Sequence, residues 1–400
     1  MSTLASKINE DPANYRVVVK GTNNVWGTLI DCLDELWVWD KIGWLLARSW
    51  NIMMPTVDEV RKFRNWWAER WELLAKRDNT NLTWNEIAQE LKDQWFTPIL
   101  IDASNDPELG KYETLLENRF RLFTMNKYES ALNEAKKAKM AMNDPFYWYD
   151  ATVMAWQWAI QRLQQEMNVP VGDIMSVSWI FSWTLAYITK EMEKWIPFSD
   201  AVYQAMKLWY TEPHPMDDLD GMDVAKKLVI IARTLWYDVG IDDVEIEWLL
   251  EDSFRSLFDE IKGFVESNYD LDNLAPWEQD KINESIRRMY AESIAQSWKN
   301  NEFSTMLKEN KWLVPRYIAT MNIVDGRPQM KVSLQFVKVD SELWSAEKNK
   351  LVVEINRDRK PLDQDPEIDV FGPLWNWAGP YATAVGTLRD VDRWLERKAA

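Results

Sequence analysis

The first third of the chain alternates short apolar runs with segments whose apolar residues recur every three or four positions. The apolar runs predict buried strands at 15–20, 42–47, 98–102 and 119–124. The intervening periodicity predicts helices at 25–36, 56–77, 83–91 and 107–117. Strands that alternate with helices in this way are typical of an α/β fold with a parallel sheet.

The rest of the chain follows other patterns. An apolar stripe predicts an amphipathic helix that begins near Met222, with Val224, Leu228, Ile231 and Leu235 on its inner face. By periodicity alone, a buried helix and a buried strand are expected at 146–163 and 178–187.

Later segments combine acidic helices with strands. Helical periodicity covers 241–263 and 270–296. Strands at 316–324 and 329–339 surround the turn sequence Asp-Gly-Arg-Pro and predict a hairpin, with a further strand at 351–355.

The stretch YTEPHPMDDLDGMDVAKK, residues 210–227, is the most informative part of the chain. Pro213 and Pro215 prevent a helix before it, and Asp220-Gly221 predicts a turn ahead of the amphipathic helix. Taken alone, this pattern fits a capped surface helix with an ion pair between Asp223 and Lys227, one turn apart.

Composition excludes several classes. A net charge of −17 argues against nucleic acid or an anionic membrane as a partner. One cysteine excludes an internal disulfide framework, and one histidine excludes a His-based metal site or a Ser-His-Asp triad. The amino-terminal residues lack an apolar signal core, and no apolar run is long enough to span a bilayer. These features predict a soluble, cytoplasmic protein.

Two residue counts are abnormal together. The chain has 26 tryptophans and 12 glycines, whereas average glycine usage of about 7% predicts roughly 28. Because glycine serves where φ is positive or backbone approaches a ligand closely, this imbalance suggests that tryptophan replaces glycine at such sites.

The spelling YTEP-x-P-x-DDL-x-G, with the following run to Ile231, resembles the substrate loop and catalytic helix of homoserine dehydrogenases. The resemblance implies a Rossmann-type dinucleotide-binding domain at 15–148, completed by 371–397. It also implies an inserted mixed α/β region, with substrate and catalytic residues at 149–310 and a β-rich dimerisation region at 311–370. It therefore predicts a homodimer.

The implied reaction is the NAD(P)-dependent interconversion of aspartate 4-semialdehyde and homoserine, on the route to threonine and methionine. Hydride delivery to an aldehyde makes an alkoxide, which needs a proton donor and a positive neighbour. The resemblance assigns this role to Lys227, with Lys127 beside it. Carboxylates suit the substrate ammonium group, and the implied substrate-binding residues are Glu212, Asp218, Asp223 and Thr184.

The cofactor turn is expected after the first strand, where the family spells GTGNVG. The corresponding residues here are Gly21, Thr22, Asn23, Asn24 and Val25, followed by Trp26. By spacing alone, an ordinary strand–turn–helix fits equally well.

Other cofactor contacts are also expected. Arg48 follows the second strand, where it either pairs with a 2′-phosphate, which favours NADP over NAD, or is a solvated loop residue. The further implied cofactor-binding residues are Ala103, Ser104, Lys127 and Gly379.

The segment YDATVMAWQW resembles the family stretch that holds a monovalent cation, such as sodium, through backbone carbonyls. The resemblance assigns the cation to Asp150, Val153, Ala155 and Gln157.

Tryptophan occupies family glycine positions repeatedly, at Trp26, Trp156, Trp179, Trp183, Trp375 and Trp377. Such substitutions predict overpacking and strained φ. Three functions therefore stay open: an active dehydrogenase, a catalytically impaired scaffold with a blocked cofactor site, and an aromatic-rich binder of sugars or apolar ligands. The pattern also suggests an engineered or designed derivative, which predicts that Trp26, Trp156 and Trp183 have lost the positive φ of glycine.

Overall fold

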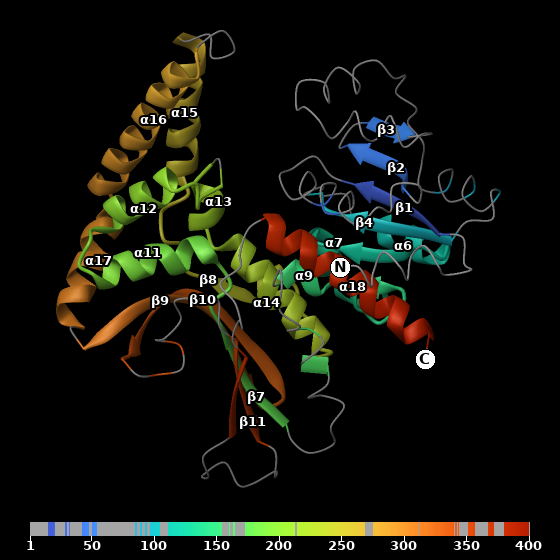
Figure 1. Ribbon diagram of the computed structural model, residues 1–400. Helices are drawn as coiled ribbons and strands as arrows, with labels where there is room; N and C mark the ends of the chain where they lie inside the picture. The colour runs from blue at the N-terminus through green and yellow to red at the C-terminus, as the bar shows by residue number, and fades with distance from the viewer. Residues whose placement is uncertain are drawn as a thin grey trace. The chain divides into compact units, whose positions relative to one another are not determined.

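The computed structural model divides the chain into two compact units. Unit 1 comprises residues 1–169, 229–240 and 375–400, and unit 2 comprises 170–228 and 241–374. Apart from isolated residues, the structure describes 15–20, 42–47, 50–53, 97–104, 111–153, 173–212, 214–268, 275–310, 312–339, 351–356, 367–371 and 380–399. Each unit has its own sheet (Figure 1).

The described sheet of unit 1 has the strand order β3-β2-β1-β4-β5-β6. Its strands are β1 (Tyr15–Lys20), β2 (Ile42–Ala47), β3 (Trp50–Met53), β4 (Thr97–Asp102), β5 (Arg121–Thr124) and β6 (Tyr147–Trp148). All neighbours pair in parallel except β2 and β3. The predicted parallel sheet is confirmed. Strands β3 and β6 were missed because they are short.

The start of β5 differs from the prediction by two residues. Helix α6 (Lys111–Glu117) ends with hydrogen bonds from Arg119 N to Leu116 O and from Phe120 N to Leu115 O. These bonds place Arg119 at φ 61°. The two residues therefore close the helix rather than open the strand.

The other helices of unit 1 are α7 (Tyr128–Leu132), α8 (Ala135–Met142), α9 (Asp150–Val153) and α18 (Pro380–Ala399). Helix α18 contacts β5 and α9, and its inner face includes Ala384, Leu388 and Val391. The apolar chains of β4 and β5 are fully buried at Leu100 and Leu122. The predicted helix at 56–77 lies outside the described residues. Residues 29 and 32, in the predicted helix 25–36, and residues 85 and 89, in the predicted helix 83–91, are helical as expected.

Unit 2 contains a second described sheet, in the order β12-β11-β7-β9-β10-β8. Its strands are β7 (Asp173–Trp179), β8 (Val244–Ile246), β9 (Leu313–Val324), β10 (Arg327–Lys338), β11 (Leu351–Asn356) and β12 (Glu367–Phe371). The predicted hairpin is β9 and β10, and its turn residues Asp325 and Gly326 have φ of 50° and 74°. Two successive positive φ values are typical of a type I′ turn, which explains the Asp-Gly signal.

Two sequence predictions in unit 2 are wrong in part. Residues 241–263 contain a 3₁₀ turn and strand β8 before helix α15 (Ser253–Asn268), because Val244–Ile246 pair in parallel with β10 at the sheet edge. Residues 178–187 are not one strand. Strand β7 ends at Trp179, and helix α11 (Trp183–Glu193) begins after Ser182, whose hydroxyl accepts the Leu185 N–H at 3.2 Å.

The remaining helices lie beside this sheet or extend away from it (Figure 1). They are α12 (Phe198–Lys207), α13 (Met216–Leu219), α14 (Met222–Thr234), α16 (Pro276–Gln296) and α17 (Trp298–Glu309). Helix α11 packs on β9, and α12 packs on α16. Helix α14 begins where predicted and belongs to unit 2 as far as Leu228. No described helix combines the length and apolar character that a bilayer crossing requires.

Candidate active site

Pro215, a short helix and a glycine turn give the acidic loop of unit 2 its shape. Helix α13 follows Pro215 and is capped by Asp220. The next residue, Gly221, has φ +69°, and a Cβ there would lie 2.1 Å from the Tyr317 hydroxyl. That hydroxyl donates to the Glu247 carbonyl at 2.7 Å. The turn predicted at Asp220-Gly221 is therefore confirmed, and it requires glycine for both conformation and space.

Asp218 lies on α13 and closes the loop onto itself. Its Oδ2 accepts the backbone N–H of Glu212 at 2.8 Å. The hydroxyl of the buried Thr184 donates to the carbonyl of Tyr210 and also faces the Asp218 carboxyl group. Burial raises the pKa of Asp218 to about 7, although the Glu212 N–H and the Thr184 hydroxyl act in the opposite direction. Three predicted substrate residues thus lie together.

Helix α14 carries the pair of Asp223 and Lys227 that the sequence predicts. The Lys227 Nζ lies 2.7 Å from Asp223 Oδ2 and donates a second bond to the Phe181 carbonyl at 3.1 Å. The lysine side chain is 13% exposed and the aspartate 40%. The charged nitrogen is thus held at a partly exposed position by two oxygen atoms from different elements.

Arg255 was missed by the sequence analysis. From α15 its guanidinium contacts Asp217 Oδ1 at 2.6 Å and Asp220 Oδ2 at 2.8 Å. Asp217 lies in the first turn of α13 and Asp220 is its C-cap, so the arginine contacts both ends of the short helix that carries Asp218. Nothing in the local spacing relates residue 255 to residue 217, and only the fold brings them together.

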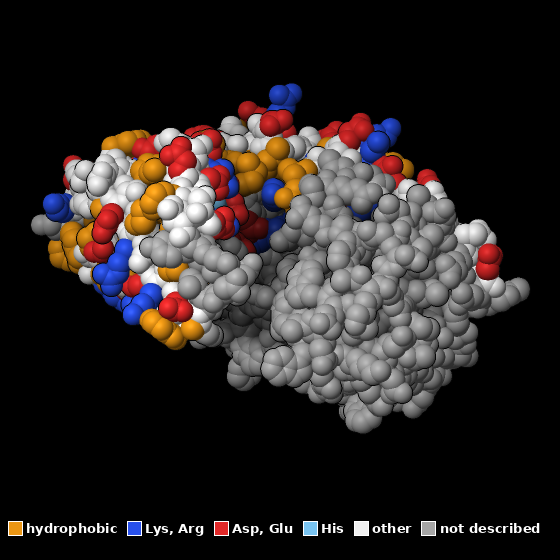
Figure 2. Space-filling model, turned by 90° about the horizontal axis from the view of Figure 1, so that it is seen from above, with side chains coloured by type: hydrophobic (Ala, Val, Ile, Leu, Met, Phe, Trp, Pro, Cys, Tyr) orange, Lys and Arg blue, Asp and Glu red, His pale blue; other side chains and the backbone are white. Residues whose placement is uncertain are grey.

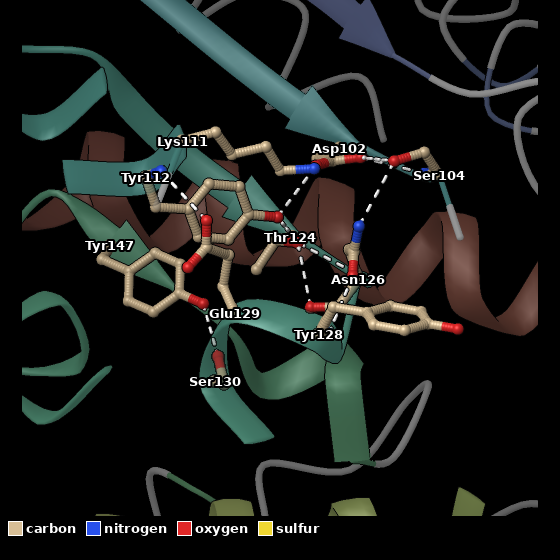
Figure 3. A network of polar contacts seen from close by, with 10 residues as sticks. All are labelled: Asp102, Ser104, Lys111, Tyr112, Thr124, Asn126, Tyr128, Glu129, Ser130 and Tyr147. Carbon is tan, nitrogen blue, oxygen red and sulfur yellow. Dashed lines mark hydrogen bonds and ion pairs between the residues drawn. The ribbon is translucent and has the colours of Figure 1, made fainter. Parts of the chain in front are cut away.

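Unit 1 has a buried polar network at the carboxyl ends of β4 and β5 (Figure 3). Asp102 ends β4 and pairs with Lys111 at 3.1 Å, and both side chains are fully buried. Its carboxylate also accepts bonds from the Tyr112 hydroxyl at 2.8 Å and from the Ser104 N–H at 2.9 Å. Burial is the main cause that raises the pKa of Tyr112 well above its usual value, and the charge of Asp102 adds to it.

The same network orders the segment that contains Lys127. The Tyr112 hydroxyl contacts that of Thr124 at 2.6 Å, and the Asn126 amide donates to the Ser104 hydroxyl at 3.3 Å. Lys127 follows directly and is half-buried at the start of α7. Ala103, Ser104 and Lys127 therefore all lie at the carboxyl edge of the parallel sheet.

That edge includes the switch point of the strand order, since β1 lies between β2 and β4. Ligands of open parallel sheets bind outside the carboxyl ends of the strands at such a point. Gly21 directly follows β1 in the chain, and Ala103 directly follows β4. The predicted cofactor residues thus come from the segments that this rule selects.

Several predicted site residues lie outside the described residues, namely Gly21, Thr22, Asn23, Asn24, Val25, Arg48, Ala155, Gln157 and Gly379. Of the expected cation residues, Asp150 and Val153 are buried in α9, and Asp150 Oδ1 accepts the Ile160 N–H at 3.0 Å. Burial raises the pKa of the nearby Asp390, and the charge of Asp150 adds to that rise. The described residues include no cluster of three His, Cys, Asp or Glu side chains suited to a metal ion.

Curated relatives share parts of this chain. A homoserine dehydrogenase from Emericella nidulans is 34% identical over 244 residues, which cover 56% of this chain and 64% of that protein. A chloroplastic bifunctional aspartokinase/homoserine dehydrogenase from Daucus carota is 30% identical over 196 residues, 47% of this chain and 21% of the relative. The matched region thus spans less than two thirds of these relatives.

Solved structures share the fold over nearly the whole chain. A Candida auris protein of unknown function has a TM-score of 0.71 at 19% identity and matches 96% of this chain and 99% of its own. A homoserine dehydrogenase from Thermoplasma acidophilum has a TM-score of 0.61 at 16% identity, with coverage of 96% and 99%. A hyperthermophilic archaeal homoserine dehydrogenase mutant in complex with NADPH has a TM-score of 0.61 at 17% identity, with coverage of 96% and 98%.

These likenesses agree with the Rossmann-type architecture of unit 1 and the mixed sheet of unit 2. The homoserine dehydrogenase family model matches residues 159–391, more than half of the chain and the region that contains the Asp218 loop and Lys227. The chain therefore belongs to the homoserine dehydrogenase family.

Proposed function

We propose that this protein is an NAD(P)-dependent oxidoreductase that interconverts aspartate 4-semialdehyde and homoserine. The observation that carries the proposal is the placement of Lys227, held by Asp223 and the Phe181 carbonyl beside the loop of Asp218. An aldehyde reduction needs a proton donor where the new alkoxide forms, and an ammonium group held by two oxygen atoms is suited to that role.

In the reductive direction, Lys227 donates a proton to the substrate oxygen, and in the oxidative direction it receives the proton of the hydroxyl group. Asp223 orients the lysine by the 2.7 Å ion pair. A nicotinamide, when bound, would supply or accept the hydride. Lys127, in unit 1, adds a positive charge in this proposal, as the family resemblance implies.

Substrate recognition follows from the carboxylates of the loop. Glu212 and Asp218 come together through the 2.8 Å bond between the Glu212 N–H and the Asp218 carboxylate. An amino-acid ammonium group would bind both carboxylates directly. Because Asp218 has a raised pKa, a cationic substrate would also shift Asp218 toward its ionised form.

The cofactor in this proposal binds at the carboxyl ends of β1 and β4, where the fit rests on the switch point of the sheet. The residues that would hold it are Gly21, Thr22, Asn23, Asn24, Val25, Ala103, Ser104, Lys127 and Gly379, and Arg48 would select NADP. Asp150, Val153, Ala155 and Gln157 would hold a sodium ion. The neighbour crystallised with NADPH supports the nicotinamide part of the proposal.

The test is an assay of homoserine oxidation with NADP and, separately, with NAD. The rate is measured from the absorbance of the reduced nicotinamide. Lys227→Ala should lower kcat about 100-fold or more, as expected for the loss of a proton donor. Lys226→Ala is the matched control, because it removes the neighbouring lysine of the same helix and should retain activity. Equal rates for the two variants would contradict the proposed role of Lys227.

The second candidate is a folded scaffold with a blocked cofactor site, which the tryptophan at position 26 of the cofactor turn favours. Calorimetric titration with NADP and then NAD separates the two candidates. A protein that melts cooperatively and binds neither nucleotide would support the scaffold.

The proposal also includes a cytoplasmic homodimer formed through the sheet of unit 2. Light scattering at several protein concentrations tests the oligomeric state.

A further inference from the structure

Three helices end with the same hydrogen-bond pattern and with tryptophan at the same position. After α11, the N–H groups of Trp195 and Ile196 donate to Met192 O and Glu191 O. After α12, those of Trp209 and Tyr210 donate to Met206 O and Ala205 O. After α14, those of Trp236 and Tyr237 donate to Arg233 O and Ala232 O. Each pair of bonds defines a Schellman motif, whose first residue after the cap is usually glycine.

The backbone at these tryptophans has the conformation that glycine serves. Their φ angles are 66° at Trp195, 58° at Trp209 and 72° at Trp236. Among the described residues, only two other non-glycine residues have positive φ, Arg119 and Asp325. A Cβ atom disfavours this region, and tryptophan has no local hydrogen bond to offset the strain, as aspartate has. Tryptophan therefore accounts for three of the five described non-glycine residues in a backbone conformation that disfavours it.

Burial of the indole rings does not account for this concentration. Trp195, Trp209 and Trp236 are 55%, 72% and 61% exposed. On the face seen in Figure 2, hydrophobic side chains lie at several separate places among acidic and basic ones. Trp209 does contact the guanidinium of Arg287 at 4.7 Å, but an exposed cation–π contact is weak.

Two described tryptophans on family glycine positions give an independent observation. Trp179 is fully buried in β7, and its indole N–H has no hydrogen-bond partner among the described residues. Trp183 is the first residue of α11. Neither has positive φ, so the expected loss of the glycine conformation is confirmed at Trp183. Trp26 and Trp156 lie outside the described residues. A buried indole donor without a partner is destabilising, and glycine would remove it.

At these three helix ends the backbone favours glycine and the residue present is tryptophan, and the genetic code offers a single cause for such an exchange. UGA is a codon that some genetic codes read as tryptophan and others as glycine. A gene that uses UGA for glycine therefore gives tryptophan at glycine sites when it is decoded with the tryptophan code. We propose that Trp195, Trp209 and Trp236, together with the tryptophans on family glycine positions, are specified by UGA, and that the source cell inserts glycine at them.

Glycine at these positions would leave Lys227 and the acidic loop unchanged but would alter the cofactor turn. One of these positions is position 26 of that turn, between the strand and the helix that follows it. The third glycine of a G-x-G-x-x-G turn, which is position 26 here, allows the helix to pack closely on the strand. The protein with glycine at these positions would then have an open cofactor turn. A blocked cofactor site would be a property only of the protein that carries tryptophan there.

The first test is the coding sequence together with the mass of the protein from its source cell. UGA at codons 195, 209 and 236, with peptides lighter by the difference between tryptophan and glycine at each site, is the expected result. UGG at these codons, or native peptides that carry tryptophan, would overturn the proposal. Trp148 is the internal control, since it is buried, stacks on Phe123 at 6.2 Å and should be encoded by UGG.

The second test is the stability of two triple variants of the full chain. Replacement of Trp195, Trp209 and Trp236 by glycine should raise Tm by about 2–4 °C per site. Replacement of the same three by alanine removes the same indoles but keeps the Cβ that the left-handed region disfavours, and should raise Tm less. If the alanine variant is as stable as the glycine variant, the conformational basis of the proposal is wrong. Trp148→Gly should lower Tm, because it opens a cavity.

Discussion

Lys227 and Asp223 form a 2.7 Å ion pair one turn apart on α14, and the same lysine nitrogen donates to the Phe181 carbonyl. An exposed pair at this spacing contributes little to stability. Here the lysine side chain is 13% exposed and is also bonded to the loop between β7 and α11, so two contacts orient it. In this respect the pair differs from the exposed surface ion pair that the sequence pattern alone predicts.

Asp223→Asn should therefore lower activity more than stability. The amide keeps the size of the side chain but loses the negative charge that orients Lys227 through the ion pair. We expect kcat for homoserine oxidation to fall about 10- to 100-fold, with Tm changed by no more than a few degrees. Steady-state kinetics and thermal melts measure both quantities. An unchanged kcat would show that Lys227 needs no partner for its role.

Asp218 should make stability depend on pH in a direction unusual for a carboxylate. Its pKa is raised to about 7 in the folded protein, mainly by burial, whereas an unfolded aspartate titrates near 3.8. Between these values the folded state binds more protons than the unfolded state, so the free energy of unfolding falls as pH rises from about 4 to 7. The charges of the nearby Glu212 and Asp223 act in the same direction.

Asp218→Asn should flatten this dependence. The variant should gain stability relative to the parent as pH rises from 4 to 8, and thermal melts across that range measure the difference. Asp242→Asn, an exposed substitution in unit 2, is the control and should leave the pH profile unchanged. If Asp218→Asn and the parent have parallel profiles, the carboxyl group does not titrate in this window.

Local signals in the sequence were sufficient for much of the fold. The Asp-Gly turn predicts the hairpin because two positive φ values need such residues. Alternating apolar runs predict the parallel sheet of unit 1, and the prolines with Gly221 predict the loop before α14. In each case, the responsible residues lie within the element itself.

Tertiary pairing explains what the sequence did not reveal. Residues 244–246 are a strand only because β10 offers an edge, and their acidic surroundings favoured helix. Arg255 reaches Asp217 across 38 positions. The buried pair of Asp102 and Lys111 depends on two elements joined by residues outside the described part of the chain. No local periodicity encodes these contacts.

Arg255→Ala should weaken substrate binding with little effect on the chemical step. The arginine holds both ends of α13, which carries Asp218, but does not contact Lys227. We expect the KM for homoserine to rise on the order of tenfold, which corresponds to ~1.4 kcal/mol, with kcat nearly unchanged. Steady-state kinetics separate the two constants.

Arg288→Ala is the matched control for this prediction. Arg288 is an exposed arginine on α16 that pairs with Glu284, and its loss should leave both constants unchanged. Arg255→Lys should recover part of the affinity, because one ammonium group can reach only one of the two carboxylates well. A loss of kcat equal to that of Lys227→Ala would instead place Arg255 in the chemistry.

Glycine substitutions test the turn at the start of α14 with two controls in the same unit. Gly221→Ala should destabilise most, because φ of +69° costs about 1–2 kcal/mol for a residue with a Cβ and because that Cβ would lie 2.1 Å from the Tyr317 hydroxyl. Gly326→Ala has a similar φ but open space, so about 1 kcal/mol is expected. Gly263→Ala lies in the interior of α15 with nothing near its Cβ and should stabilise by about 0.5–1 kcal/mol.

The Tyr317 contact can be separated from the φ of Gly221 by one further variant. Tyr317→Phe removes the hydroxyl that a Cβ at position 221 would meet, and it also removes the bond to the Glu247 carbonyl. Denaturant unfolding of the single and double variants gives the coupling energy between the two sites. The double variant should be more stable than the sum of the single effects predicts, because the clash exists only when both side chains are present. Additive effects would mean that the loop moves away from Tyr317 when alanine is introduced.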